Sequence, residues 1–142
     1  GLLDYQDALA GHPAYDLVSL LEDARRDTAP ELREAMLARY LARRPELEPQ
    51  GFRAAHAALG AQRNLKIIGI FARLSLRDGK ARYPAFIPRV WRHLESDFAH
   101  PALAPLAGLV RAHLPPPEPG LLERLAAAAA RAAGRASAGG AP

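Results

Sequence analysis

The feature that most constrains the fold is a long helical stretch at residues 50–77. Its apolar side chains recur at the threes and fours typical of one helix face, at Phe52, Leu59, Ile67, Ile70, Phe71 and Leu74. The second half is apolar on nearly all sides, which predicts a central helix that Asp78 and Gly79 bring to an end. Gly60 and Gly69 each weaken a helix by about 1 kcal/mol relative to alanine, so we expect close packing or a kink there.

The rest of the chain reads as a series of shorter amphipathic helices. Thr28 and Glu31 have the spacing of a capping box, with Pro30 in the first helical turn. No run of alternating or β-branched residues predicts a pair of strands, so the fold class is mainly α. The predicted helices are residues 13–26, a segment from Thr28 to before Pro45, residues 50–77, a segment after Tyr83-Pro84 and a segment from Pro101 to Pro115.

The first residues resemble the end of a buried strand. Gly1, Leu2 and Leu3 form an apolar tripeptide that leads directly into the polar run Asp4 to Asp7. A strand needs a partner, and the remaining sequence offers none. We therefore expect a fragment of a larger protein, with residues 1–3 as a short strand remnant and the missing part upstream.

Composition excludes several classes of protein. Hydrophobic residues make up 49% of the 142 residues and charged residues 24%, which is a globular balance, and there is no cysteine for a disulfide scaffold or a thiol nucleophile. The longest central apolar run, residues 65–76, is interrupted by Lys66 and Arg73. It falls short of the roughly 18–20 apolar residues that cross a bilayer, so no membrane contact is predicted.

Basic residues accumulate in the later part of the chain. Residues 31–117 carry fourteen basic side chains against seven acidic ones. Because they are spread through helices without interleaved stacking aromatics, they favour an arginine-rich helical surface over a nucleic-acid face. A basic helical module that binds an acidic partner or nucleic acid remains the alternative.

Three acids of the opening segment are candidates for chemistry. Asp4 follows the strand end, where one or two carboxylates can hold Mg²⁺ beside nucleotide phosphates, and Asp7 lies in the same turn. Acids in turns also cap backbone amides, so spacing alone leaves both interpretations open. Asp16 lies in the first turn of a predicted helix, where a negative charge is favourable in any case.

The run through Asp4, Gly11, Pro13, Asp16 and Leu17 resembles the metal-binding segment of aminoglycoside phosphotransferases and choline kinase-like enzymes. The stretches LLEDARRD, QRNLKIIGIFAR and RDGK, which begin at residues 20, 62 and 77, are similar to those of bacterial anomeric kinases of N-acetylmuramate and N-acetylglucosamine in cell-wall recycling. This resemblance covers about residues 1–117. It implies the helical part of the C-terminal lobe of a protein-kinase-like fold.

The resemblance also implies an activity. The parent protein would be a cytoplasmic, ATP-dependent phosphotransferase acting on an amino-sugar hydroxyl, with ATP and Mg²⁺ as cofactors and with neither membrane nor nucleic acid as a partner. Asp4 matches the metal ligand of the family. Asp16 matches the buried acid that supports the catalytic loop.

The two ends of the chain have different expected roles. Residues 1–117 would form the helical part of the lobe, incomplete without upstream sequence. Residues 118–142 would form an alanine-rich frayed helix and a disordered tail, with one docked turn at Leu121, Leu122 and Leu125.

The catalytic loop of the family is missing from this sequence. That loop reads His-x-Asp, with an asparagine five residues after the Asp. None of the five histidines has an Asp two residues later, and Asn64 is the one asparagine in the chain. We therefore expect no catalytic residue within the fragment and no activity from the fragment alone.

Arg63, Asn64 and Lys66 place polar groups on adjacent turns of the apolar central stretch. Buried polar groups must be paired, so one interpretation is a structural network that binds loop ends. The other is recognition of a polyhydroxylated sugar, and the sequence leaves both open.

Aromatic and histidine side chains offer weaker candidates. Trp91 and Tyr83 could stack on a sugar ring, but their spacing from neighbouring apolar residues favours core packing. His93, His100 and His113 show no metal-ligand spacing and are expected at the surface or at helix caps.

Overall fold

A computed structural model of the chain describes residues 10–138, with side chains described as far as residue 135. No strand occurs among these residues, and the predicted mainly α class is confirmed. The strand remnant expected at residues 1–3 lies outside the described residues. The elements are α1 (Ala14–Leu21), α2 (Pro30–Ala42), α3 (Pro49–Leu76), the 3-10 turn η1 (Tyr83–Phe86), α4 (Ile87–Phe98), the 3-10 turn η2 (Pro101–Leu103), α5 (Ala104–His113) and α6 (Pro119–Ala138).

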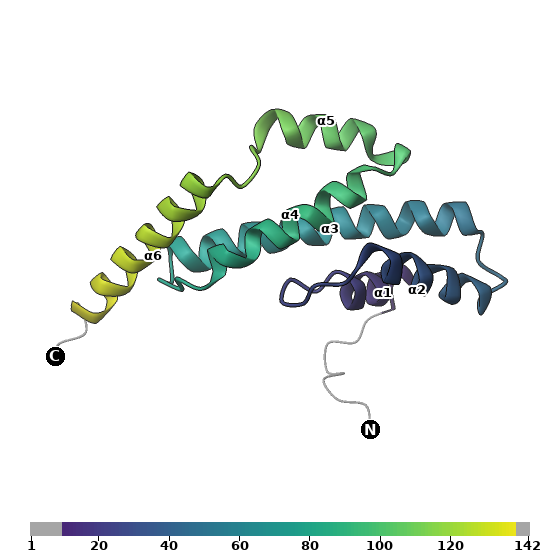
Figure 1. Cartoon of the computed structure of the whole chain (residues 1–142), viewed down its shortest axis with the longest axis horizontal. Coiled ribbons are helices and arrows are strands. Elements are labelled where there is room, and N and C mark those ends of the chain that lie inside the picture. The colour runs from purple at the N-terminus through teal and green to yellow at the C-terminus, as the bar shows by residue number, and fades with distance from the viewer. Residues whose placement is uncertain (1–9, 139–142) are drawn as a thin grey trace, which may run out of the picture.

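Helix α3 is the axis of an elongated molecule (Figure 1). Helices α1 and α2 lie along its first half, and α4 runs back beside it toward its N-terminal end. Helix α5 packs against the pair formed by α3 and α4, and α6 packs against the C-terminal part of α3. The prediction of a central helix is confirmed.

Both ends of α3 have a clear local cause. At the start, Pro49 occupies the first turn, and the Glu48 carboxylate accepts hydrogen bonds from the backbone N–H groups of Gln50 and Gly51. At the end, Gly79 adopts a positive φ of 64°, which glycine tolerates without steric cost. The observed helix agrees with the predicted stretch 50–77 to within one residue at each end.

The first two helices differ from the prediction. Helix α1 ends at Leu21, five residues before the predicted end, because the chain turns at Glu22 and carries that side chain into the interior. Helix α2 begins at Pro30 with Ala29 as its N-cap, and no side chain caps it. The prediction of a capping box at Thr28 is therefore wrong. A residue before proline is pushed into extended geometry, and Ala29 takes the cap position.

Three apolar clusters lie along α3. One surrounds Phe52 near its start, one surrounds Leu94 and Trp91 of α4, and one surrounds Phe71 near its end. Trp91 is buried, and Tyr83 packs its ring 5.1 Å from that of Phe71, so the prediction of core packing for both aromatics is confirmed. Each cluster takes part of its wall from α3, which explains why that helix is apolar on several sides.

Helix α6 is longer than the single docked turn predicted for the tail. Leu122 and Leu125 pack against the cluster at the end of α3, and Ala129 is fully buried. The backbone of Ala133 approaches Gly79 so closely that a Cβ on that glycine would lie 2.7 Å from the Ala133 nitrogen. The absence of a side chain on Gly79 thus allows the backbone of α6 to lie against this turn. The division of the chain at residues 117 and 118 stays a prediction.

Two glycines in the interior of α3, Gly60 and Gly69, should respond oppositely to substitution by alanine. A Cβ on Gly60 would lie 2.5 Å from Oδ1 of Asp97, so Gly60→Ala is expected to lower the free energy of unfolding by about 1–3 kcal/mol. A Cβ on Gly69 would meet nothing within 4 Å, and Gly69→Ala is expected to raise it by about 1 kcal/mol. Urea unfolding of both variants measures this, and equal effects would contradict the close packing at Gly60.

Candidate functional site

The segment between α1 and α2, residues 22–29, begins with a buried acid. The residue after α1, Glu22, is only 2% exposed. It continues the buried stripe of Val18 and Leu21 on α1, so its carboxylate lies in the core. A buried carboxylate needs donors, and α3 supplies them.

Asn64 joins Glu22 to a second buried acid, Asp97 of α4. Its Nδ2 donates to Oε2 of Glu22 at 2.7 Å and to Oδ2 of Asp97 at 2.9 Å, and Asn64 itself is fully buried. The neighbouring Arg63 donates from Nη1 to the backbone carbonyl of Glu22 at 3.1 Å. These four residues, the Glu22 cluster, tie the end of α1 to α3 and α4.

The two carboxyl groups of the Glu22 cluster both have raised pKa values. Burial raises the pKa of Glu22. Burial and then the nearby charge of Glu22 raise the pKa of Asp97 to about 8. Near neutral pH the pair therefore holds one proton, because two buried carboxylates at one amide cannot both ionise without cost.

Ion pairs fix the rest of the 22–29 segment to α4. Nε and Nη2 of Arg89 donate to the two carboxylate oxygens of Asp27, each at 2.7 Å, and Nη1 donates to the carbonyl of Ala24 at 3.0 Å. The hydrogen bond from Arg89 lowers the pKa of Asp27. The conformation of the segment is thus set by Arg63 and Asn64 at one end and by Arg89 at the other.

A pocket of about 360 Å³ opens beside the Glu22 cluster, between α2, the first half of α3 and the end of α4. Glu22 and Asp97 belong to its lining, so the buried acids border an open space. Its other polar lining residues are Arg33, Glu34, Arg53, His56, Ser96 and His100, and its apolar ones are Pro30, Leu37, Ala57, Ala99 and Pro101.

Arg33 reaches across this pocket from α2 to α4. Its Nη1 donates to Nδ1 of His93 at 3.2 Å, and its Nη2 approaches Oγ of Ser96 at 3.4 Å. Burial and then the positive charge of Arg33 lower the pKa values of His56 and His93 to about 4. Both imidazoles are therefore neutral at pH 7. Because Nδ1 of His93 accepts the hydrogen bond from Arg33, the proton of that ring is on Nε2.

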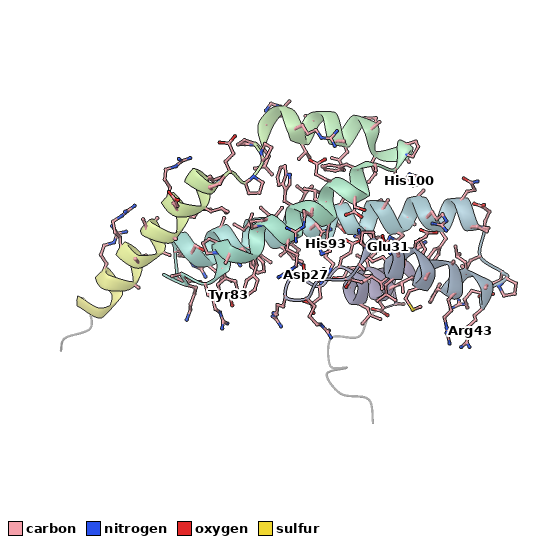
Figure 2. The ribbon with its side chains drawn as sticks, viewed as in Figure 1. Asp27, Glu31, Arg43, Tyr83, His93 and His100 are labelled. Carbon is pink, nitrogen blue, oxygen red and sulfur yellow. The ribbon has the colours of Figure 1, made fainter. Side chains whose placement is uncertain are left out.

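The histidines depart in part from the prediction. His93 is buried on α4, so the expected surface or cap position is wrong for it; its register with Val90 and Leu94 turns it inward. His100 does cap, since its Nδ1 accepts from the backbone N–H of Ala102 at 3.2 Å, and His113 is exposed at the end of α5. Figure 2 shows His93 near the middle of the molecule and His100 where the chain turns toward α5.

The structure separates the other candidate residues. Asp4 and Asp7 lie outside the described residues, and Asp16 is exposed in the first turn of α1. Its predicted support of a catalytic loop depends on a loop that this sequence does not contain, so that role stays a prediction. Arg63 and Asn64 meet in the Glu22 cluster, whereas Lys66 is exposed. The structure therefore places Arg63 and Asn64 together and Lys66 apart from them, and their role in sugar binding stays a prediction.

Within residues 10–138, no group of three or more His, Asp or Glu side chains could hold a metal ion. The Mg²⁺ expected from the resemblance thus depends on Asp4, outside that part of the chain. Nor is any of the described helices long and apolar enough to cross a membrane.

The sequence interpretation missed four residues of this region: Glu22, Arg33, His56 and Asp97. A signal for two of them was present, because Glu22 continues the stripe of Val18 and Leu21, and Asp97 lies one turn after Leu94 on the apolar face of α4. An acid on an apolar stripe predicts a buried partner.

The first part of the chain is similar to a family of phosphate-transferring enzymes. Residues 1–57 match the Phosphotransferase enzyme family, which confirms the resemblance seen in the opening segment.

More specific similarity extends further along the chain. The chain is 54% identical over 115 residues to the N-acetylmuramate/N-acetylglucosamine kinase of Caulobacter vibrioides. This match covers 81% of the chain and 32% of the relative. The proteins of that name in Pseudomonas aeruginosa and Neisseria meningitidis are each 43% identical over 117 residues, covering 78% of this chain and 35% of the relative. The chain spans about a third of the length of these curated relatives.

Proposed function

We propose that this chain is the helical part of the C-terminal lobe of an ATP-dependent kinase that phosphorylates an amino sugar, N-acetylmuramate or N-acetylglucosamine. The observation that carries the proposal is 54% identity over 115 residues to a kinase named for those two sugars. The matched length covers 81% of this chain, so it extends well beyond the opening segment that the family shares. A cytoplasmic location fits such an enzyme, because ATP is its phosphate donor.

In this function the described helices act as a scaffold for chemistry that lies elsewhere. Asp4 would contribute a carboxylate to Mg²⁺, and the metal would supply positive charge to the nucleotide phosphates. The Glu22 cluster and the Arg89–Asp27 pair hold the segment after α1 against α3 and α4. Because α1 begins at Ala14, downstream of Asp4 in sequence, a fixed α1 would anchor the chain that leads away from the metal ligand.

The proposal is tested in the full-length protein that contains this chain. Asp4→Ala is expected to reduce kcat/KM for N-acetylglucosamine with ATP by more than tenfold, because the metal would lose a ligand. Glu123→Ala, an exposed acid on α6, is the matched control and should retain activity. Activity of Asp4→Ala within tenfold of the unchanged enzyme would remove the metal role.

Two further measurements belong to this test. Residues 1–142 alone are expected to show no ATP-dependent phosphorylation, since they contain no His-x-Asp loop. Absence of sugar phosphorylation by the unchanged full-length protein would reject the kinase proposal itself.

The basic interaction module is the weaker alternative. Arg53, Arg89 and Arg111 each pair with a carboxylate, of Glu34, Asp27 and Glu95 respectively, which leaves less positive charge for an acidic partner. Binding to duplex DNA whose logarithm falls linearly with the logarithm of salt concentration would favour it.

A further inference from the structure

An apolar groove with a volume of about 310 Å³ lies between α1 and α2. Its lining residues, which define the α1–α2 groove, are Leu17, Leu20, Met36, Arg39, Tyr40, Arg43 and Arg44. Leu17 and Tyr40 also belong to the apolar cluster around Phe52, so the groove continues that cluster outward to the surface. Single exposed apolar side chains are ordinary, but a contiguous apolar patch with a polar rim marks an interaction site.

The rim of the groove carries positive charge that is not matched. Arg44 pairs with Glu46 and donates from Nη1 to the hydroxyl oxygen of Tyr40 at 3.3 Å. Within the described part of the chain, the guanidinium groups of Arg39 and Arg43 have neither an ion-pair nor a hydrogen-bond partner. Figure 2 shows Arg43 on the side of α2 away from α3. Two unpaired cations beside an apolar floor fit an occupant that carries carboxylates.

The walls of the groove are held in place by contacts of their own. The ring of Tyr40 lies 5.3 Å from that of Phe52 on α3, and Cζ of Arg44 lies 5.8 Å from the centroid of the Tyr40 ring. Leu17 packs against the same cluster from α1. A surface that is already ordered binds a partner with a smaller loss of conformational entropy.

The charges of the rim decide which kind of occupant fits. In a symmetric dimer the same patch of each copy meets itself, so Arg39 and Arg43 would face a second set of arginines. Like charges held close together across an interface oppose association. An amphipathic helix with apolar side chains on one face and carboxylates beside them matches both the floor and the rim. Because Arg39 and Arg43 are one helical turn apart, its acids should also lie about one turn apart.

The length of the relatives indicates where such a helix comes from. The chain spans about a third of the curated relatives that it matches. In a kinase of that length, most of the polypeptide lies outside this chain and is covalently tethered to it. A tethered segment has a high effective concentration at the groove, so it is favoured over a separate protein.

We propose that the α1–α2 groove is an intramolecular docking surface for an acid-bearing amphipathic helix from the part of the full-length protein outside this chain. Apolar side chains of that helix cover Leu20 and Met36, and its carboxylates pair with Arg39 and Arg43. This rests on the proposed function in one respect, namely that the chain belongs to a longer polypeptide. The groove is then a place where the α1 and α2 scaffold meets the rest of the protein.

The first test replaces Leu20 with the photo-crosslinking residue p-benzoylphenylalanine in the full-length protein. Irradiation is expected to join position 20 to an acid-bearing segment of the same polypeptide outside residues 1–142, which mass spectrometry of the linked peptides identifies. Leu20 is 63% exposed and Leu109 of α5 is 59% exposed, so position 109 is the matched control and should not link to that segment. Cross-linked dimers, or links from position 20 only to residues 1–142, would overturn the proposal.

Thiol labelling gives a second measurement that needs no bulky side chain and decides the question if the cross-linker hinders folding. In the full-length protein, Leu20→Cys should react roughly tenfold more slowly than Leu109→Cys, because a reagent reaches a covered thiol only when the structure opens locally. Adding Arg39→Glu and Arg43→Glu should bring the two rates together. Equal rates before this charge reversal would overturn the docking surface, and a slow rate that survives it would overturn the acidic occupant.

These outcomes are distinct from those that test the proposed function, because neither measurement depends on phosphoryl transfer. Equal labelling rates in a protein that phosphorylates N-acetylglucosamine would overturn the docking surface and leave the kinase proposal intact. The expected cross-link in a protein without any sugar phosphorylation would support the docking surface and reject the kinase.

Discussion

Replacing Asn64 with leucine is expected to destabilise the protein by about 3–5 kcal/mol, the loss typical of breaking a buried charged network. Leucine keeps most of the volume and removes Nδ2, which donates to both Glu22 and Asp97. The two buried carboxyls would then face each other without that donor. Chemical unfolding, followed by circular dichroism, measures the change in the free energy of unfolding.

Lys66→Gln provides the control for this prediction. Lys66 lies on the same helix, two residues after Asn64, and is exposed. Its replacement by glutamine should change the free energy of unfolding by less than about 0.5 kcal/mol. A loss below 1 kcal/mol for Asn64→Leu would show that the Glu22 cluster contributes little to stability. The fold would then depend on the apolar clusters along α3.

Stability should fall as the pH rises from 7 to 9, and Asp97 should be the cause. Its pKa of about 8 lies above the ordinary 3.8, so between these values the folded state holds a proton that the unfolded state releases. Stability is then lost progressively as the pH rises through that window. From pH 7 to 9 the expected loss of stability is about 1 kcal/mol. It is the last part of the whole contribution of the raised Asp97 pKa, which is on the order of several kcal/mol at 1.36 kcal/mol per pKa unit.

The histidines do not obscure this effect. His56 and His93 have pKa values lowered to about 4, so their contribution to stability is lost when the pH falls below about 6.5, outside the measured window. Asp97→Asn should abolish the loss between pH 7 and 9. Asp78→Asn is the control, because its exposed carboxyl has a lowered pKa and stays ionised throughout. An unchanged pH dependence in Asp97→Asn would sink the assignment.

The sequence predicted the long elements of this fold better than the short ones. Helix α3 could be placed to within a residue because its periodic pattern is long and its ends carry proline and glycine. Helix α1 could not, because its end is decided by the burial of Glu22 against Asn64, a tertiary contact between distant segments. The prediction for the start of α2 failed for a local reason, since the effect of Pro30 on the residue before it outweighed the capping preference of Thr28.

The candidate site was predicted only in part. Asn64 and Arg63 were recognised as polar groups in an apolar helix, and the structural network proposed for them is consistent with their contacts to Glu22. The pocket was not foreseen, because Arg33 and His56 lie on amphipathic segments where polar residues ordinarily face solvent. Their proximity follows from how α2 lies beside the first half of α3, which no local pattern encodes.

The close approach of Gly60 to Asp97 also limits how this sequence can evolve. A side chain at position 60 would occupy the space that the Asp97 carboxyl fills, so the two positions cannot vary independently. A larger residue at 60 becomes acceptable only once position 97 has lost its acid, and that change would leave Asn64 with a single acidic partner. Substitutions at positions 60, 64 and 97 should therefore covary across related proteins, and a relative that changes one of them should differ at the others.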